Sequence, residues 1–238
     1  MHIGILQTDR VMDGFREAHG DYPEMFERFF KSVDSTVAIT NYWVQDIAQI
    51  PSDTACDAYV ITGSRHSVYE PLPWIPSLVD FLHEVLSAKK KVIGVCFGHQ
   101  LMAHYFGGRV AAAPQGWAVG VHESRLLRCP AWMGKVESDR IALISSHKDQ
   151  VVELPDGAEL YATNDFCPIT GFTVDDQVLT IQGHPEFAKA YSKVLMDMRR
   201  DILGPDVHAR GLLSLVEQTD ELLLAEWMLR FVQGVSDG

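Results

Sequence analysis

Short apolar segments alternate with polar, helix-compatible stretches in the first half of the chain. The segments that read as strands are continuously apolar, and they cover residues 2–8, 36–44, 58–62 and 91–95. Apolar residues at helical spacing predict helices between and after them, over residues 22–30, about 77–88 and 99–106. Continuously apolar strands that alternate with helices are typical of a parallel sheet covered on both faces. We therefore expect an α/β fold.

The second half of the chain has a different pattern, in which short strands follow one another with turns between them. These expected strands cover residues 109–113, 120–127, 141–145, 159–163, 171–174 and 178–182. They predict an antiparallel or mixed extension of the sheet, with Asp175 and Asp176 in a hairpin turn. Helices are expected over about 188–202, 207–216 and 221–232. No linker or repeat divides the chain, so we predict one domain over residues 1–238, with a core of about 1–187 and C-terminal helices over about 188–234.

One of the expected strands ends in a turn that carries a cysteine between two glycines. Gly94 and Gly98 flank Cys96, and a helix-compatible segment follows at once. A side chain at either glycine would collide with the crossing backbone of such a tight turn. The thiol would lie beside a helix N-terminus, whose positive end favours the thiolate. A small buried cysteine is the simpler interpretation, but the glycine spacing favours a nucleophile.

Charge, cysteine spacing and hydropathy argue against several classes of protein. The net charge of −12, from 32 acidic and 20 basic residues, argues against a nucleic-acid surface, which needs a clustered basic face. The four cysteines lie far apart with no Cys-x-x-Cys pair, which argues against a disulfide framework or a zinc site. The chain opens directly as a strand, and no apolar run approaches the roughly 20 residues of a membrane span. We expect a cytoplasmic protein without membrane partners.

A thiolate nucleophile needs a base that takes and returns a proton, and a third group that orients the base. His184 directly follows an expected strand, and Glu186 stands two residues later with Pro185 between them. A carboxylate held in this way can accept a hydrogen bond from one imidazole nitrogen while the other nitrogen faces the thiol. The same four residues, 183–186, also suit a solvated turn that leads into a helix. Together with the cysteine turn, they favour a catalytic pair.

These two motifs, at residues 94–100 and 183–186, resemble those of the class I (triad-type) glutamine amidotransferases. The likeness is greatest to stand-alone members related to the glutaminase part of GMP synthase. It implies a Rossmann-like three-layer fold with a central, mostly parallel sheet, helices on both faces and a small antiparallel extension. It also implies that Cys96 is the nucleophile, His184 the general acid/base and Glu186 its orienter. Members of this family hydrolyse a γ-glutamyl amide through a thioester and release ammonia.

The resemblance also implies an oxyanion hole. Residues 62–64, Thr-Gly-Ser, match the family's glycine loop. The backbone N–H of Gly63 and that of Phe97, the residue after the nucleophile, would then face the developing negative charge. Backbone donors in this role commonly contribute about 3 kcal/mol each to transition-state stabilisation.

Four residues match positions at which the family binds its substrate. Gln100 corresponds to a glutamine that contacts the amino-acid end of the substrate, and Ser64 lies in the glycine loop. Ser146 and His147 belong to a Ser-His-x-Asp-x-Val segment whose loop recognises the substrate α-carboxylate. His147 could instead be a second catalytic base, but the resemblance favours the substrate loop.

The remaining motifs do not indicate a metal, cofactor or ATP site. His99 and His104 are five residues apart, which is wrong for two metal ligands on one helix face, so we expect no metal. We expect no cofactor either, and no phosphate loop indicates an ATP-using part. Trp117, in a Gly-Trp-x-x-Gly segment that resembles stand-alone relatives, fits a packed turn or a pocket wall equally well.

Three functions remain open. The first is a glutamine amidotransferase or glutaminase that acts on the small molecule glutamine, with a separate synthetase or acceptor protein taking up the ammonia. The second is a γ-glutamyl peptidase that cleaves a small γ-glutamyl peptide or conjugate by the same chemistry. The third is a non-catalytic binding module on the same fold, which the intact set of Cys96, His184 and Glu186 argues against.

Overall fold

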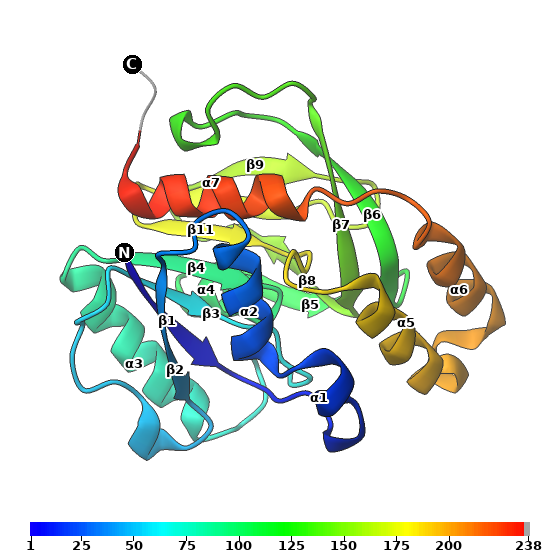
Figure 1. The fold of residues 1–238 in the computed structure, drawn as a ribbon, viewed down its shortest axis with the longest axis horizontal. Coiled ribbons are helices and arrows are strands. Elements are labelled where there is room, and N and C mark those ends of the chain that lie inside the picture. The colour runs from blue at the N-terminus through cyan, green and yellow to red at the C-terminus, as the bar shows by residue number, and fades with distance from the viewer. Residues whose placement is uncertain (236–238) are drawn as a thin grey trace.

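The computed structural model describes residues 1–235 and is built around a nine-stranded sheet (Figure 1). Five neighbouring strands pair in parallel. In their order across the sheet they are β2 (Ala38–Trp43), β1 (His2–Gln7), β3 (Ala58–Ile61), β4 (Lys91–Val95) and β11 (Val178–Ile181). Strand β2 lies at the edge and none of its residues is fully buried, whereas β3 is buried throughout. The predicted α/β fold with a mostly parallel sheet is confirmed.

The remaining four strands extend the sheet in antiparallel fashion. They are β10 (Gly171–Val174), β9 (Ala158–Thr163), β6 (Ala118–Leu126) and β7 (Arg140–His147). The hairpin turn between β10 and β11 was predicted correctly, and Asp175 takes a positive φ of 47° in it. The expected strand over 178–182 joins the two parts of a mixed sheet, because it pairs antiparallel with β10 and in parallel with β4.

A separate two-stranded sheet was not predicted. It consists of β5 (Arg109–Ala112) and β8 (Asp149–Glu153). Strand β8 has charged residues at both ends, and its first residues fall in the segment that the sequence assigned to a substrate loop. That segment is in fact the end of β7 and the start of β8, with only Lys148 between them.

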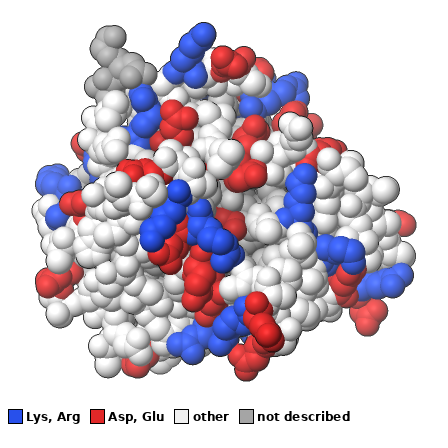
Figure 2. Space-filling view, in the orientation of Figure 1, with Lys and Arg blue, Asp and Glu red and all other residues white. Residues whose placement is uncertain are grey.

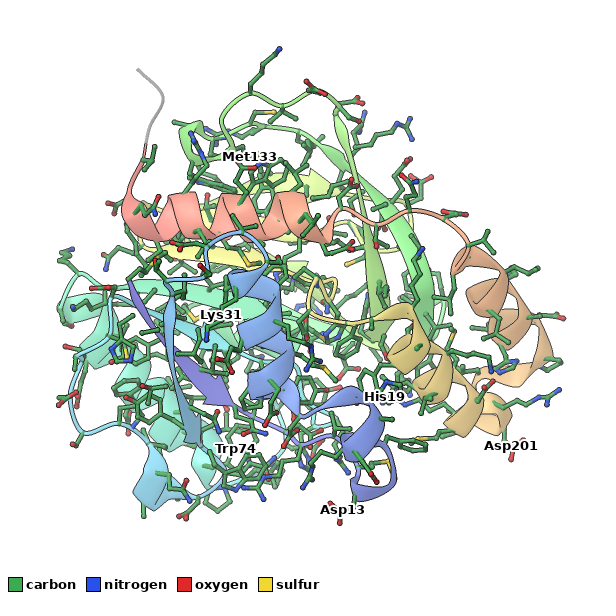
Figure 3. The ribbon with its side chains drawn as sticks, viewed as in Figure 1. Asp13, His19, Lys31, Trp74, Met133 and Asp201 are labelled. Carbon is green, nitrogen blue, oxygen red and sulfur yellow. The ribbon has the colours of Figure 1, made fainter. Side chains whose placement is uncertain are left out.

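Helices cover both faces of the parallel half (Figure 1). One face packs against α2 (Tyr22–Lys31) and α7 (Glu221–Gln233), and the other against α3 (Trp74–Ser87) and α4 (Phe97–Tyr105). Successive strand residues divide between these layers: Val60 joins the first core, while Tyr59 and Ile61 join the second. Figure 3 shows the side chains that fill the space between these helices and the sheet.

The remaining helices lie around the carboxyl ends of the parallel strands and beside the extension (Figure 1). They are α1 (Asp13–His19), α5 (Lys189–Met198), α6 (Arg200–Ser214) and the short turns η1 (Ile47–Gln49) and η2 (Ala131–Met133). The helix expected over 188–202 ends early, because the chain breaks at Arg199 between α5 and α6. Gly204, with a φ of 73°, then kinks α6. None of the described helices is both long and apolar enough to cross a membrane.

Basic and acidic side chains are interspersed on the face shown in Figure 2. Exposed ion pairs among the described residues include Arg109–Glu153 and Lys193–Asp197. This face therefore presents a mixed surface in which neither sign of charge dominates.

Close backbone contacts explain the two glycines beside Cys96. A Cβ atom at Gly94 would lie 2.6 Å from the carbonyl oxygen of Gly98, and one at Gly98 would lie 2.6 Å from that of Ile61. The backbones of β3, β4 and the start of α4 are thus so close together that only glycine fits at these two positions. This packing places the start of α4 directly against the end of β3.

We predict that Gly98→Ala destabilises the fold by about 1–3 kcal/mol, because the added methyl group meets backbone atoms that cannot move aside. Urea unfolding measures the change. Gly14→Ala is the matched control: Gly14 lies in α1 with nothing within 4 Å of a Cβ atom, and alanine there should be neutral or stabilising. Equal stability of the two variants would contradict the close packing at Gly98.

Candidate active site

Three neighbouring parallel strands bring Gly63, Cys96 and His184 together. Strand β3 ends two residues before Gly63, β4 directly before Cys96, and β11 three residues before His184. Functional groups of open parallel sheets collect at this edge. A Cβ atom at Gly63 would lie 2.7 Å from Cε1 of His184 and 3.7 Å from Cβ of Cys96. The two side chains therefore lie beside each other over a residue that must be glycine.

Cys96 has a strained backbone. Its φ of 50° and ψ of −95° lie outside the regions that residues with side chains prefer, and such a conformation costs on the order of 1–3 kcal/mol. Neighbouring backbone groups hold it in place: the Cys96 amide donates to the carbonyl of Ile181 at 2.9 Å, and its carbonyl accepts from the amide of Gln100 at 3.0 Å. A strained conformation that is fixed from two sides is typical of a functional turn.

Three neighbouring groups fix the position of His184. Its Nδ1 donates to Oε1 of Glu186 at 2.8 Å, and both side chains are almost fully buried. Its backbone amide donates to the carbonyl of Ile144 at 2.7 Å. The ring of Phe187 stacks on the imidazole at a centroid distance of 4.0 Å and an interplanar angle of 9°. These contacts fix the plane of the imidazole and leave its other ring nitrogen facing Cys96.

The charges around His184 determine its protonation. Burial alone would lower the pKa of its imidazole, but the negative charges of Cys96 and Glu186, together with hydrogen bonds to both, outweigh burial and raise the pKa to about 10. His184 is then an imidazolium at neutral pH, and it lies between the side chains of Cys96 and Glu186.

The two backbone amides expected to form an oxyanion hole are those of Gly63 and Phe97. Within the described residues, neither the amide of Gly63 nor that of Phe97 has a hydrogen-bond acceptor in the protein. Phe97 is the first residue of α4, so its amide points out of the helix end. Both amides are available to an anionic oxygen next to Cys96.

The thiol opens into a cavity of about 240 Å³. All four residues expected to bind substrate line it: Ser64, Gln100, Ser146 and His147. The amide nitrogen of Gln100 donates to the carbonyl of Asp149 at 2.7 Å and to Oε1 of Gln182 at 3.1 Å. Gln100 thereby ties the start of β8 to the cavity wall.

His147 is fully buried, and burial lowers its pKa to about 3. Its Nδ1 donates to the backbone carbonyl of Asp149 at 3.0 Å. A neutral imidazole whose Nδ1 is already engaged is a fixed hydrogen-bonding group at physiological pH. This arrangement suits a role in the cavity wall.

Trp117 was left open between a packed turn and a pocket wall, and it lines the cavity. The guanidinium of Arg199 lies over its ring, 5.0 Å from the centroid, and donates to Oγ of Ser146 at 2.8 Å. Arg199 was not among the predicted site residues, because nothing in the local sequence distinguishes an arginine at the end of an expected helix. Phe187 was also missed, although it directly follows Glu186.

The motif histidine His99 is a structural residue. Its two ring nitrogens contact Oγ1 of Thr180 at 2.9 Å and the carbonyl of Ile169 at 3.1 Å, and burial lowers its pKa to about 3. In the part of the chain that the structure describes, no group of three or more His, Cys, Asp or Glu side chains is arranged to hold a metal ion.

The pKa of His184 has a consequence for stability. It lies above the value of about 6.5 of an unfolded histidine. The folded state therefore keeps a proton that the unfolded state has released between about pH 6.5 and about 10. The resulting stabilisation is fully present below this window and is lost as the pH rises through it.

We predict that Glu186→Gln lowers the pKa of His184, because the variant loses a buried negative charge at hydrogen-bond distance. NMR titration of the imidazole measures the pKa, and the loss of stability above neutral pH should shift to lower pH with it. The matched control is Glu70→Gln, which removes the partner of the more exposed His66 and should leave His184 unchanged. An unaltered titration of His184 in the Glu186 variant would refute this electrostatic account.

Comparison with known proteins agrees with this geometry. The family profile "Glutamine amidotransferase class-I" matches residues 18–196. "Gamma-glutamyl peptidase 3" of Arabidopsis thaliana is 34% identical over 59% of this chain and 60% of its own length, so the match spans less than two thirds of that relative. One chain of a glutamine-hydrolysing GMP synthase from Halobacterium salinarum is 30% identical over 71% of this chain and 86% of its own length.

A solved structure of a glutamine amidotransferase from Thermotoga maritima superposes with a TM-score of 0.74 at 18% identity. The superposition covers 98% of this chain and 99% of the other, so the fold is shared over its full extent. The profile match covers most of the chain and includes both the Cys96 turn and the His184–Glu186 pair. The chain belongs to the class I glutamine amidotransferase family.

Proposed function

We propose that the protein hydrolyses γ-glutamyl amides with Cys96 as nucleophile, His184 as general acid/base and Glu186 as the group that orients it. The observation that carries the proposal is the strained Cys96 turn directly beside a buried imidazole that Glu186 holds in one orientation. Amide hydrolysis through a covalent enzyme intermediate commonly uses such a nucleophile–base–orienter set.

The reaction has two stages. The Cys96 thiolate attacks the γ-carbonyl carbon, and the amides of Gly63 and Phe97 stabilise the oxyanion. His184 donates its proton to the leaving nitrogen, the C–N bond breaks, and a γ-glutamyl thioester remains on Cys96. A water molecule then gives a proton to His184 and attacks the thioester, which releases glutamate and restores the thiolate–imidazolium pair.

Glutamine is the first candidate substrate, with ammonia as the leaving group. Ser64, Gln100, Ser146 and His147 would hold its amino-acid end in the cavity next to Cys96. A separate synthetase or acceptor protein would then use the ammonia, because the GMP synthase relative is itself one chain of a multi-chain enzyme. A reducing, cytoplasmic setting would keep the Cys96 thiol free.

γ-Glutamyl peptides are the second candidate substrates. A curated relative carries the name of a γ-glutamyl peptidase, and a further cavity lies on the His184 side of the site. The chemistry is the same for both candidates, and only the leaving group differs.

We predict that Cys96→Ala abolishes glutamate formation from glutamine and from γ-glutamyl peptides while the fold is retained. Glutamate release and circular dichroism measure the two effects. A diazo-ketone analogue of glutamine should label Cys96 and spare Cys129, although Cys129 is the exposed cysteine. Residual turnover in the variant, or preferential labelling of Cys129, would exclude Cys96 as the nucleophile.

We also predict that Phe187→Leu lowers kcat by about tenfold or more with little change in KM, because the imidazole loses the ring that fixes its plane. The control is Phe29→Leu, a similar loss of buried aromatic surface on α2. The kinetics of both variants should be compared at matched stability. An equal decrease of kcat in the two variants would show that the stack on His184 has no special role.

A further inference from the structure

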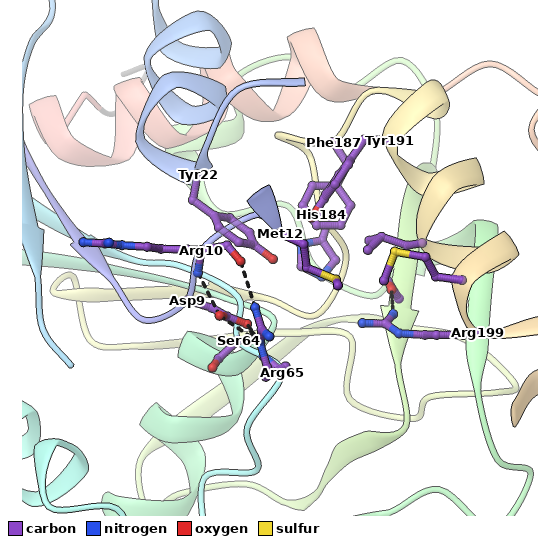
Figure 4. A pocket seen from close by; sticks show the side chains of 13 residues that line it. Asp9, Arg10, Met12, Tyr22, Ser64, Arg65, His184, Phe187, Tyr191 and Arg199 are labelled. Atoms are coloured by element: carbon purple, nitrogen blue, oxygen red, sulfur yellow. Dashed lines mark hydrogen bonds and ion pairs between the residues drawn. The ribbon is translucent and has the colours of Figure 1, made fainter. Parts of the chain in front are cut away.

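A second cavity, whose lining residues Figure 4 shows, has a volume of about 220 Å³. His184 lines this second cavity and Cys96 lines the first. Both cavities share four lining residues: Ser64, Arg65, Ser146 and Arg199. The two spaces therefore meet between the nucleophile and the acid, where a scissile bond must lie.

The position of His184 indicates which cavity would hold each half of a substrate. The acyl half bonds to Cys96 and belongs in the first cavity, with Gln100 and His147. The leaving nitrogen takes its proton from His184, so the group attached to that nitrogen extends into the second cavity. This assignment rests on the proposed γ-glutamyl hydrolysis.

The second cavity is larger than ammonia requires. Ammonia is about the size of a water molecule, whose share of liquid volume is about 30 Å³, and the cavity measures about 220 Å³. Besides polar and charged residues such as Asp9 and Arg10, its walls include six large apolar or aromatic side chains, which come from α2, from α5 and the segment before it, and from the residue before α1. These are Tyr22, Phe187, Tyr191, Leu195, Met12 and Met198. Walls of this kind suit an organic group with apolar parts.

A cation lies where the cavities meet. Arg199 is half-buried, and within residues 1–235 no carboxylate forms an ion pair with it. Its guanidinium contacts Ser146 and the Trp117 ring. The neighbouring Arg65 is neutralised, because its Nε lies 2.9 Å from Oδ2 of Asp9. Arg199 is thus a positioned positive charge in a chain whose net charge is −12.

We propose that this second cavity is a leaving-group site for an amino acid or short peptide with an apolar side chain, and that Arg199 binds its free carboxylate. A guanidinium that is held in place from one side and exposed to a cavity on the other matches carboxylate recognition. The favoured substrates are then γ-glutamyl amides of α-amino acids. Glutamine fills only the acyl half of the site.

Three substrates test the proposal, with glutamate formation as their common readout: γ-glutamyl-leucine, γ-glutamyl-leucinamide and glutamine. The first two differ only in the carboxylate of the leaving group. The wild-type enzyme should favour γ-glutamyl-leucine over the leucinamide by about tenfold or more in kcat/KM, as expected for a hydrogen bond between charged groups. In Arg199→Gln this ratio should approach one, and Arg199→Lys should keep part of it.

Arg200→Gln is the matched control, since Arg200 is the next residue along the chain, is exposed and lines neither cavity. It should keep the wild-type ratio. A second variant tests the cavity without altering Arg199: Met198→Glu places a negative charge on a wall residue that is 41% exposed. It should lower kcat/KM for γ-glutamyl-leucine more than for the leucinamide, and Met198→Gln should preserve the wild-type ratio between them.

The outcomes distinguish a failure of the proposed hydrolysis from a failure of the proposed leaving-group site. If no γ-glutamyl amide is cleaved, the proposed function itself fails. If all three substrates are cleaved but the wild type shows no preference for the carboxylate, the leaving-group site is refuted while the function stands. An equal loss for all three substrates in Arg199→Gln would also refute it, because Arg199 would then act on the glutamyl half.

Discussion

The site depends on one close contact between backbones. Strand β4 can turn into α4 at Cys96 only because Gly94 and Gly98 let the turn pack against itself and against Ile61 of β3. This contact fixes the unusual backbone of Cys96 and directs the first amides of α4 toward the thiol. It also brings Gly63, which follows β3, beneath His184. The residues proposed as nucleophile, oxyanion donors and acid therefore share one rigid frame, in which a small displacement would be costly for the proposed catalysis.

The second constraint is electrostatic. Burying a charged imidazole is unfavourable unless opposite charges are near, and His184 has two of them in Cys96 and Glu186. Without these neighbours, burial alone would lower the pKa of the imidazole. Phe187 adds a flat surface that covers one face of the ring. The fold thus keeps a charged imidazole buried in a protein whose net charge is negative.

The sequence predicted those parts of the site that local motifs encode. Cys96 with its glycines, and His184 with Glu186, each lie within a few residues of a strand end, and parallel pairing then brings the two segments together. By contrast, Arg199 reaches the cavity only through the packing of α5 against β6 and β7, which no local pattern reveals. Strand β8 was missed for a similar reason, since its partner β5 is distant in the sequence and its ends are charged. The proposed catalytic roles and the single-domain assignment remain predictions.

In this fold, the residues proposed for catalysis and those that form most of the cavity walls come from different segments. The residues proposed as nucleophile, acid and oxyanion donors all follow the ends of neighbouring parallel strands. The antiparallel extension returns to this edge through the bridge between Ile144 and His184, which places Ser146 and His147 opposite Cys96. Helix α5 then adds the apolar wall and, at its end, Arg199. Because the walls come from segments outside the parallel core, substitutions there can change which amide is cleaved without altering the strained turn that cleaves it.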